Sequence, residues 1–513
     1  MFAFCNQLFE LISNKSSDNK IFSWHFGCKS LHNLNKKQHI CNFKQYHHNT
    51  GNMTLIKSIS GIRGTIGGRP GEGLSPLDLV KFTAAFGSWI KKRSKKQSPV
   101  LVVGRDARVS GSMVNQIVTA NLNALGIQVL DLGLASTPTT EMAVVGENAD
   151  GGIILTASHN PGNWNALKLL NSKGEFISDI EGKEILQLAQ MEDFNYAGVD
   201  NLGKSKVLDY WDQKHIDLVL KLPLVDVNSI KKANFSVVFD SVNSVGGIVL
   251  PKLLVALGIK NFIGLNAEAN GIFAHNPEPL PQNLTQISAE MVLQKADVGF
   301  VVDPDVDRLA VVCEDGTMFG EEYTLVAVAD YVLKSTPGNT VSNLSSTRAL
   351  RDVTALYGQS YFASAVGEVN VVEMMKSKNA IIGGEGNGGI IYPELHYGRD
   401  ALVGIALFLS QLAKGRISCS GLRKKYPAYF MSKNKIELKA GMDVDNLLIQ
   451  IAGKYKHEQI NTMDGVKIDF AEQWVHLRKS NTEPIIRIYT ESVSQETADD
   501  LAEKFANEIL ALV

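Results

Sequence analysis

The sequence is poor in several features that would assign it to a broad class of protein. Its 513 residues include five cysteines, too few for a disulfide-stabilised scaffold, which favours a reducing compartment. The longest apolar stretches, such as Leu402–Leu409, are much shorter than the roughly 18 residues of a membrane-spanning helix. Neither sign of charge dominates, since 51 lysines and arginines nearly balance 53 aspartates and glutamates. We therefore expect a cytoplasmic protein that binds neither nucleic acid nor a membrane.

What the sequence does contain is the composition of an ordinary globular protein, with 44% hydrophobic and 20% charged residues. A length of 513 residues, at roughly 150 residues per domain, allows three or four domains. These properties indicate a multidomain enzyme, whose chemistry has to be sought in its motifs.

The first 52 residues differ in composition from the remainder. They hold three of the five cysteines and five of the eleven histidines, and their net charge of +4 leaves −6 on the rest of the chain. They sustain neither helical nor strand periodicity and lack the features of secretory or mitochondrial targeting peptides, so we predict a disordered extension. A zinc site of Cys28, His32, His39 and Cys41 is an alternative, although its spacing fits no common zinc finger. A further hypothesis is that the native chain starts at Met53.

From Met53 onward, helix-like and strand-like patterns alternate. Ser75-Pro76 precedes a helical run, the apolar run Val100–Val103 follows it, and a second helical pattern leads to the strand-like Gln128–Leu130. This order predicts parallel sheets covered by helices. Valine-rich runs that end in aspartate recur near Asp106, Asp240 and Asp303, and this recurrence suggests three related α/β domains.

The C-terminal region has a different pattern. Two strand-like runs, Trp474–Leu477 and Ile485–Tyr489, flank a polar loop, and a final helix is expected to start near Ser494. This pattern predicts a small α+β domain.

The first of four polar loops, Thr156–Gly162, follows the apolar strand Gly152–Leu155. Ligands of α/β sheets bind beyond the carboxyl ends of strands, where Ser158 is expected, although a turn that satisfies its own backbone is an equally simple interpretation. The loop contains no G-x-S-x-G motif, and His159 is poorly placed by its adjacency to act as the base of Ser158. Both observations disfavour an acyl-transfer hydrolase.

The second loop, Asp303–Arg308, follows the strand Val298–Val302 and contains three alternating carboxylates. Hard oxygen ligands of this kind suit Mg²⁺ or Ca²⁺, and without a cation the three carboxylates would repel one another. An EF-hand is disfavoured because Arg308 takes the place of the required glycine and both flanks are strand-like. A solvated acidic turn remains the alternative, and metal binding is the stronger prediction.

The third loop, Gly383–Gly389, follows Ala380–Ile382 and contains a G-x-G-x-x-G pattern. A dinucleotide-binding turn should lead into a helix, but the residues after it remain extended up to Pro393. The glycines would instead let Glu385 and Asn387 approach a polar ligand such as sugar hydroxyls, unless the loop is simply a flexible turn.

The fourth loop runs from Arg478 to Pro484 and is followed by Arg487. Arginines, hydroxyls and an asparagine on a short loop between strands can form an oxyanion site, since arginine donates forked, charge-assisted hydrogen bonds. A plain solvated turn is the alternative.

Taken together and in this order, the four loops resemble the α-D-phosphohexomutases, which include phosphoglucomutase, phosphomannomutase and phosphoglucosamine mutase. The resemblance extends from Met53 to Val513. The similar segments are Ser60–Gly64 (N-terminal signature), Thr156–Gly162 (phosphoserine loop), His275–Pro279 (close to H-x-P-[DE]-P), Asp303–Arg308 (D-x-D-x-D-R metal loop) and Arg478–Thr482 (distal phosphate loop).

The resemblance implies three related α/β domains and a C-terminal α+β domain around a central cleft. After an extension of residues 1–52, the boundaries that we predict are 53–205, with the phosphoserine loop; 206–308, ending in the metal loop; 309–430, with the sugar loop; and 431–513, for phosphate binding.

The activity implied is the interconversion of hexose 6-phosphates and hexose 1-phosphates. Ser158 would pass a phosphoryl group to the free hydroxyl of the sugar phosphate, and the bisphosphate would turn end for end before its other phosphate returns to Ser158. The resemblance implies one Mg²⁺ per chain, held by Asp303, Asp305, Asp307 and a phosphoserine oxygen on Ser158. It further implies hexose 1,6-bisphosphate as activator, sugar phosphates as partners, and a monomer or homodimer.

The site residues carried over from the family fall into two groups. The catalytic group is Ser158, Lys168, Arg63 and His159, and the substrate-binding group is Arg308, Glu385, Asn387, Arg478, Ser480, Asn481, Thr482 and Arg487. Arg63 and Lys168 would assist proton transfer and stabilise charge.

The sugar loop departs from the pattern of many bacterial members, which have G-E-x-S-G-H. Here Asn387 replaces the serine and Gly389 replaces the histidine. The resulting G-E-x-N-G-G form resembles that of phosphoglucosamine mutases from some bacterial and archaeal lineages, which favours glucosamine phosphate as substrate. Glucose and mannose phosphates are the alternative, and a metal-dependent phosphatase or a non-catalytic sugar-phosphate-binding protein are more remote ones.

Overall fold

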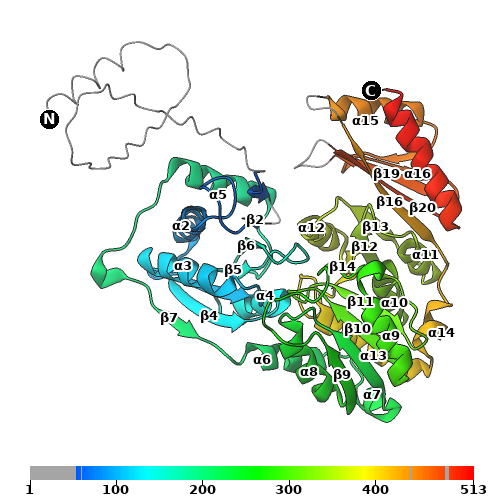
Figure 1. The fold of residues 1–513 in the computed structure, drawn as a ribbon, viewed down its shortest axis with the longest axis horizontal. Helices are drawn as coiled ribbons and strands as arrows, with labels where there is room; N and C mark the ends of the chain where they lie inside the picture. Colours follow the sequence, from blue (N-terminus) through cyan, green and yellow to red (C-terminus); the bar gives the residue numbers. More distant parts are fainter. Residues whose placement is uncertain (1–52, 59–60, 439–441, 480–484, 513) are drawn as a thin grey trace, which may run out of the picture. The chain divides into compact units, whose positions relative to one another are not determined.

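The computed structural model describes residues 53–58, 61–438, 442–479 and 485–512. Within them, helices and strands form four sheet-based domains in chain order (Figure 1). The disorder, the zinc alternative and the alternative start predicted for the N-terminal extension all concern residues outside these ranges. None of the described helices is both long and apolar enough to cross a membrane.

The first domain is built on a mixed sheet with the order β1-β2-β6-β5-β3-β4-β7. Its strands are β1 (Ile56–Ser58), β2 (Gly61–Thr65), β3 (Val100–Arg105), β4 (Gln128–Leu134), β5 (Gly151–Leu155), β6 (Trp164–Leu170) and β7 (Ser205–Val207). Its helices are α2 (Pro76–Arg93), α3 (Gly111–Ala124), α4 (Thr137–Gly146) and α5 (Asp179–Met191). A short 3-10 helix, Val199–Asn201, precedes β7.

Strand β3 shows how an apolar run becomes a strand covered on both faces. Leu101 and Val103 pack into the core beneath α2, whereas Val102 packs into the separate core beneath α4. The two faces are covered because side chains alternate along a strand. The predicted start of α2 is confirmed, since Ser75 caps it in a capping box with Asp78.

The second and third domains have four-stranded sheets with the orders β11-β10-β8-β9 and β13-β12-β14-β15. The strands are β8 (Ser236–Asp240), β9 (Asn261–Leu265), β10 (Val298–Val302), β11 (Leu309–Cys313), β12 (Asn339–Asn343), β13 (Tyr361–Ser364), β14 (Ala380–Glu385) and β15 (Gly389–Ile391). The helices are α6 (Trp211–Leu220), α7 (Val227–Ala233), α8 (Gly246–Leu257), α9 (Thr285–Gln294), α10 (Glu321–Ser335), α11 (Ala349–Leu356), α12 (Glu368–Lys378), α13 (Ala401–Gly415) and α14 (Cys419–Arg423), with a 3-10 helix at Pro281–Asn283. These two domains share one continuous apolar core, in which Phe408 of α13 meets Phe300 and Phe319 edge-to-face.

The three α/β sheets repeat one arrangement. In each, three parallel strands are flanked by one antiparallel strand, so that β6-β5-β3-β4, β11-β10-β8-β9 and β15-β14-β12-β13 correspond. The prediction of three related α/β domains is therefore confirmed. The valine-rich runs that suggested it were wrongly assigned, however, because those before Asp240 and Asp303 are neighbouring parallel strands of one sheet.

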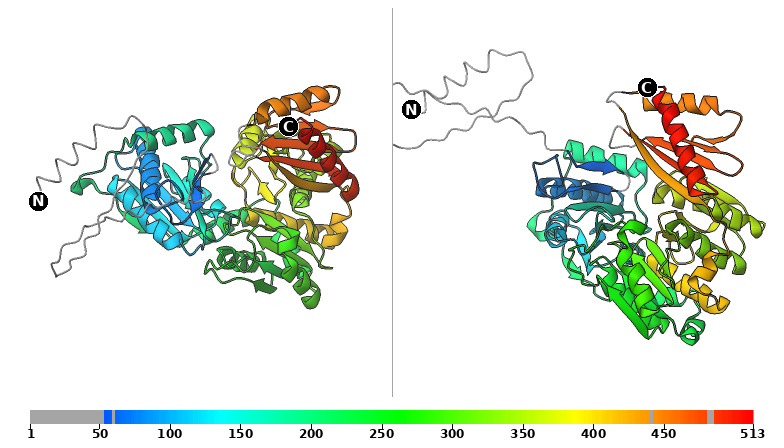
Figure 2. Two further views of the ribbon diagram at one scale, coloured as in Figure 1. Left: turned by 45° about the horizontal axis from the view of Figure 1, so that its top comes forward. Right: turned by 45° about the vertical axis from the view of Figure 1, so that its right-hand side comes forward.

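The C-terminal domain is an antiparallel sheet with the order β16-β20-β19-β18-β17. Its elements are β16 (Phe430–Glu437), α15 (Val444–Lys454), β17 (Gln459–Asn461), β18 (Val466–Asp469), β19 (Trp474–Lys479), β20 (Ile485–Ser492) and α16 (Gln495–Leu510). Both helices pack on one face of the sheet in a single core, and Figure 2 shows α16 lying across that face from two further sides. The predicted α+β domain and its final helix, capped by Ser494, are confirmed.

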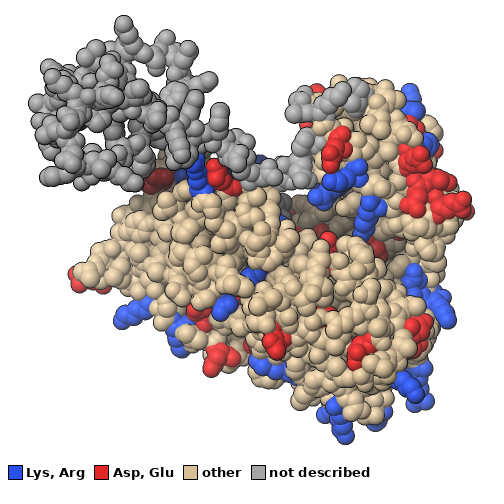
Figure 3. Space-filling view, viewed as in Figure 1, with Lys and Arg blue, Asp and Glu red and all other residues tan. Residues whose placement is uncertain are grey.

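Two predicted domain boundaries cut through sheets. Strand β7 pairs with β4 beyond residue 205, and β11 pairs with β10 beyond residue 308. The visible surface carries charges of both signs, with acidic side chains gathered over α16 (Figure 3). Basic residues do not dominate the described part of the face that this view shows.

Candidate active site

The functional loops occupy corresponding positions in the three α/β sheets. Each connects a parallel strand to its antiparallel neighbour: residues 156–163 link β5 to β6, residues 303–308 link β10 to β11, and residues 386–388 link β14 to β15. All three follow the carboxyl end of a parallel strand, where α/β sheets bind their ligands.

The serine loop presents Ser158 in a strained backbone conformation. Its φ is +47°, in the left-handed region that a residue with a Cβ rarely adopts. The Oγ atom donates a hydrogen bond of 2.7 Å to Oδ2 of Asp303, in the second domain. Strain of this kind persists only where the surroundings enforce it, and it is concentrated at functional sites.

The acidic loop brings its three carboxylates together. Oxygens of Asp303, Asp305 and Asp307 lie within 4.8 Å of one another, and all three residues are fully buried. Oδ1 of Asp303 accepts hydrogen bonds from the backbone N–H groups of Asp307 and Arg308. Val306, at φ +62°, provides the turn that directs the carboxylates to one side.

Side chains from other domains hold these carboxylates. Thr137, at the start of α4, donates its hydroxyl to Oδ2 of Asp305 at 2.6 Å. Lys168 of β6 donates to the same oxygen at 2.7 Å and lies 3.4 Å from Oδ2 of Asp307. Arg399 donates to Oδ2 of Asp307 at 2.6 Å. The loop is therefore fixed by charged contacts from both neighbouring domains.

The carboxylates differ in their tendency to ionise. Burial raises the pKa of Asp303 well above its ordinary value, and the charges of Asp307 and Asp305 raise it further. Burial also acts on Asp305, but the charge and hydrogen bond of Lys168 outweigh it and lower the pKa below its ordinary value. Like charges this close need a cation for all of them to ionise.

The donor set fits a hard divalent cation. Among the described residues, Oδ1 of Asp305 and Oδ1 of Asp307 are buried without any hydrogen-bond donor. Mg²⁺ would satisfy these two oxygens, which lie beside the carboxylate of Asp303, because this ion prefers oxygen ligands and needs few carboxylates. The residues present therefore suit the ion that the motif predicts.

His159 and Arg63 lie beside the serine loop. Nδ1 of His159 is 3.3 Å from Oγ of Ser158, closer than its adjacency in sequence suggested. Burial and the charges of Arg308, Arg399 and Arg63 hold the pKa of His159 well below its ordinary value, so its imidazole is neutral. Nη1 of Arg63, on β2, lies 3.5 Å from Oδ1 of Asn160.

Arg308 closes the acidic loop. It is almost fully buried, with Nε 4.0 Å from Oδ1 of Asp307 and Nη1 3.9 Å from Oε1 of Glu278. Glu278 belongs to the His275–Pro279 segment, which the resemblance singled out. The guanidinium therefore lies between the acidic loop and that segment.

The carboxylate of Glu385 is bound by protein donors on both oxygens. Oε1 accepts from the Asn343 amide and from the Gly367 N–H, and Oε2 accepts from Nη1 of Arg399 at 2.8 Å. Asn387 lies 3.5 Å from Oε2 and accepts from the N–H of Gly389. Arg399 thus joins the sugar loop directly to Asp307 of the acidic loop.

Arg399 also occupies the space beside Gly389. A Cβ placed on Gly389 would lie 2.3 Å from Cδ of Arg399, well inside any tolerable contact. The space that a side chain at position 389 would enter is therefore filled here by Arg399, ten residues further along the chain. Arg399 also binds a third carboxylate, that of Glu368, which accepts hydrogen bonds from the Nε and the backbone N–H of Arg399.

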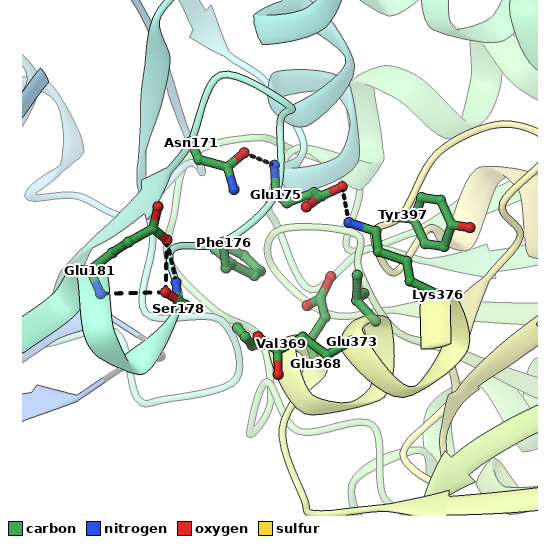
Figure 4. A pocket seen from close by; sticks show the side chains of 11 residues that line it. Asn171, Glu175, Phe176, Ser178, Glu181, Glu368, Val369, Glu373, Lys376 and Tyr397 are labelled. Atoms are coloured by element: carbon green, nitrogen blue, oxygen red, sulfur yellow. Dashed lines mark hydrogen bonds and ion pairs between the residues drawn. The ribbon is translucent and has the colours of Figure 1, made fainter. Parts of the chain in front are cut away.

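A pocket of about 140 Å³ lies next to Glu368 (Figure 4). Residues of the first domain around Phe176 line one side, and α12 lines the other. The ion pair of Glu175 with Lys376 bridges the two sides. The first and third domains are therefore linked at this pocket as well as through Arg399.

The C-terminal arginines lie apart from this network. Arg478 and Arg487 are direct cross-strand partners on β19 and β20. Nε of Arg478 lies 2.8 Å from Asp464, whose other contacts reach the loop before α12 through the N–H of Val366. Ser480, Asn481 and Thr482 lie outside the described residues.

Two residues that bind the acidic loop were missed from the sequence: Arg399 and Thr137. Thr137 begins α4, and Arg399 directly precedes Asp400, the cap of α13, so the start of a helix could have drawn attention to both. Their partners, however, lie in other loops or other domains, so nothing in their local sequence distinguishes them.

Comparison with known proteins agrees with this geometry. Family models of phosphoglucomutase/phosphomannomutase match in order: α/β/α domain I at residues 55–196, domain II at 213–316, domain III at 320–429, and the C-terminal domain at 436–508. A phosphoglucomutase/phosphomannomutase of Thermococcus kodakarensis is 34% identical over 86% of this chain and 96% of its own length. A phosphoglucosamine/phosphogalactosamine mutase of Sulfurisphaera tokodaii is 32% identical over 88% of this chain and 98% of its own length.

A solved structure gives the same result. The crystal structure of a phosphoglucomutase/phosphomannomutase family protein from Burkholderia thailandensis superposes with a TM-score of 0.77 at 25% identity, and covers 90% of this chain and 97% of its own. Four matched domains, relatives of full length and one shared fold lead to a single assignment. The chain belongs to the phosphoglucomutase/phosphomannomutase family of the α-D-phosphohexomutase superfamily, whose members are isomerases that transfer a phosphoryl group within the substrate.

Proposed function

We propose that this protein interconverts glucosamine 6-phosphate and glucosamine 1-phosphate through a phosphoserine at Ser158. The observation that carries the proposal is the hydrogen bond of 2.7 Å from the Ser158 hydroxyl to Asp303, within a cluster of three buried carboxylates. A nucleophile held beside a cation site is what phosphoryl transfer requires, because the reaction depends on positioning and on charge stabilisation.

Each turnover consists of two transfers in line. In the first, the free hydroxyl oxygen of the sugar phosphate bonds to the phosphorus on Ser158, the bond from phosphorus to Oγ breaks, and the hydroxyl proton leaves to a base. The bisphosphate then reorients. In the second, Oγ gives up its proton and bonds to the other phosphorus, the bond from that phosphorus to the sugar oxygen breaks, and the sugar oxygen takes up a proton, which restores the phosphoserine and releases the isomer. A hexose 1,6-bisphosphate, as activator, would phosphorylate Ser158 in the first place.

The residues around Ser158 have separate roles in this scheme. Asp303, Asp305 and Asp307 would hold Mg²⁺, which neutralises charge on the phosphoryl group. Neutral His159, 3.3 Å from Oγ, can exchange a proton with the serine. Lys168 stays charged in its pairs with Asp305 and Asp307, since their charges raise its pKa despite burial. Arg63 would stabilise the transferred group.

Substrate binding would fall to the sugar loop and the C-terminal domain. The cross-strand pair of Arg478 and Arg487 places two like charges side by side, an arrangement that an anion between them would relieve. Ser480, Asn481 and Thr482 would complete this phosphate site, with Arg308 at the reacting end. Asn387 and Glu385 would contact the sugar ring.

Glucosamine phosphate is favoured over other hexoses by the G-E-x-N-G-G loop. The Sulfurisphaera relative, named for activity on amino sugars, supports this choice. A phosphoglucomutase/phosphomannomutase is the second candidate, because the Thermococcus relative carries that name.

A coupled assay tests the proposal. Glucosamine, glucose and mannose 6-phosphates are supplied separately with Mg²⁺ and a catalytic amount of glucose 1,6-bisphosphate, and formation of each 1-phosphate is measured. We expect the highest kcat/KM with glucosamine phosphate and none in Ser158→Ala. An active Ser158→Ala would overturn the mechanism, release of inorganic phosphate without isomerisation would indicate a phosphatase, and a preference for glucose or mannose would favour the second candidate.

A further inference from the structure

Arg108 has a side chain that is almost fully buried against the serine loop. It lies between β3 and α3 and is 1% exposed. Its guanidinium donates to four backbone carbonyls of one short segment: Nη1 to Pro161 and Trp164 at 2.6 and 3.0 Å, and Nη2 to Asn160 at 2.7 Å and to Ser158. One side chain therefore binds the carbonyls along most of the serine loop.

The same guanidinium closes a ring of hydrogen bonds around Ser158. Nε of Arg108 donates to Oδ2 of Asp106 at 2.9 Å, and the Thr156 hydroxyl donates to that oxygen at 2.6 Å. The Thr156 hydroxyl in turn accepts from the N–H of Ser158 at 2.9 Å. Both backbone polar groups of Ser158 are thus held by one closed ring of three other side chains.

This ring opposes the strain at Ser158. A left-handed conformation is unfavourable for a residue with a Cβ, so an unconstrained loop would relax to another backbone geometry. Relaxation at this residue would swing Oγ away from Asp303, to which it donates at 2.7 Å. The ring keeps the backbone in the one conformation that directs the hydroxyl to the acidic loop.

The second domain covers Arg108. The ring of Phe273 lies 5.0 Å from its guanidinium carbon, and a Cβ on Gly271 would lie 1.9 Å from the carbonyl oxygen of Ala107. Because this loop fits closely over Arg108, water does not compete for its donors. Lysine could keep the charge beside Asp106, but its three donors radiate from one nitrogen and cannot reach carbonyls spread over seven residues.

We infer that Arg108 is a positioning residue for phosphoryl transfer: it fixes the strained backbone of Ser158 so that Oγ stays in line between the acidic loop and the sugar phosphate. The inference rests on the proposed role of Ser158. It assigns Arg108 no contact with the substrate, which is why the effect of its loss falls on kcat and on phosphorylation of Ser158, and leaves KM unchanged.

Two substitutions break the ring on opposite sides. Arg108→Lys retains the charge and loses the fork, and Thr156→Val retains the shape and loses both hydroxyl hydrogen bonds. The matched control is Arg423→Lys, since Arg423 donates to the backbone carbonyl of Phe319 far from Ser158. Steady-state kinetics are measured per folded protein, and the rate of Ser158 phosphorylation by glucose 1,6-bisphosphate is followed by intact mass spectrometry.

We expect both ring variants to lose about 100-fold in kcat and in the phosphorylation rate, with KM within about threefold of the parent. The double variant should lose little more than Arg108→Lys alone, because both changes open the same ring. Arg423→Lys should keep its kcat.

Three results would overturn the inference. They are a kcat and a phosphorylation rate within about threefold of the parent in the ring variants, a raised KM at unchanged kcat, and additive losses in the double variant. Should Arg108→Lys fail to fold, the kcat, KM and phosphorylation rate of Thr156→Val test the inference on their own. Ser158→Ala remains inactive in all of them if the proposed function holds, so the two failures are distinguishable.

Discussion

The two ends of the candidate site are built in opposite ways. At the reacting end, Ser158 and the three aspartates are buried, and side chains from the first and third domains fix the aspartates with short hydrogen bonds and ion pairs. At the proposed phosphate-binding end, Arg487 is exposed, and Arg478 has its guanidinium beside the single carboxylate of Asp464. The contrast is between a preorganised centre and an adaptable one.

The difference follows from what each end has to do. Phosphoryl transfer gains from fixed groups that need no rearrangement during the reaction. In the proposed mechanism the sugar turns end for end and would present its phosphate in two orientations, which a rigid binding site would discriminate against. Changes at the reacting end should therefore lower kcat, and changes at the other end should raise KM.

Asp305→Asn is expected to have the largest effect. It removes a charge from the cation site and leaves the Lys168 ammonium with one fewer partner. We expect kcat to fall about 1000-fold and the Mg²⁺ concentration for half-maximal rate to rise, since charge neutralisation by a metal contributes several kcal/mol. A Mg²⁺ titration of both proteins checks this, and an unchanged half-maximal concentration would contradict the metal assignment.

Arg399→Ala should come next. Among the described residues, the substitution leaves the buried carboxylates of Glu368 and Glu385 without a paired cation and removes one of the cationic partners of Asp307. An uncompensated buried charge destabilises a protein by about 3–5 kcal/mol, so Tm should fall together with kcat. Thermal denaturation and kinetics are compared with those of Arg351→Ala, where the arginine is half-exposed and pairs only with Asp352 among the described residues. An equal loss of Tm and kcat in the two variants would contradict a role for Arg399 in holding the reacting end.

Arg478→Ala tests the other end. Loss of a charge-assisted hydrogen bond to phosphate weakens binding by about 1.5–3 kcal/mol, so KM should rise about 10- to 100-fold while kcat changes little. Lys479→Ala is the control, because Lys479 is the next residue on β19 and pairs with Asp445. A loss in kcat instead of KM would mean that this end is as rigidly coupled to the chemistry as the first.

The smallest effect on catalysis is expected at His476, which supports the proposed phosphate-binding end and acts on stability. Its ring lies 2.9 Å from the Ser345 hydroxyl and 2.7 Å from the Asp464 carbonyl, and burial lowers its pKa to about 4. Between its unfolded pKa near 6.5 and about 4, the unfolded chain binds a proton that the folded chain does not. Stability should therefore fall as the pH falls through this window, by on the order of 3 kcal/mol.

His476→Gln should remove this dependence. The Tm of the parent and of His476→Gln is measured at pH 7 and at pH 4.5. The difference in Tm between the two proteins should narrow or reverse at the lower pH. A parallel decline of both Tm values would assign the acid sensitivity to other groups.

Much of the fold could be predicted from local pattern. The strands before Ser158, Asp303 and Glu385 form as expected because apolar runs that end in polar loops are typical of buried parallel strands. The order of strands within a sheet could not be predicted in this way. Val298–Val302 lies beside Val237 instead of beginning a third domain, since pairing depends on long-range packing.

The site was predictable only in part for the same reason. Residues that share a loop, such as the three aspartates, form a motif from which metal binding can be predicted. Arg399 and Thr137 meet those aspartates only after three sheets have come into contact. Their roles arise from tertiary structure, which one sequence does not encode in any local pattern.

The close approach of Arg399 to Gly389 has a consequence for the history of the family. Positions 389 and 399 compete for one volume. A side chain at position 389 is therefore compatible with a large residue at position 399 only after repacking. In an alignment of relatives, the two columns should therefore vary together: histidine in the sugar loop should accompany a short residue ten positions later, and glycine should accompany arginine. A change from the histidine form to the glycine and arginine form would then pass through an intermediate with an unfilled space or an overcrowded one at this position.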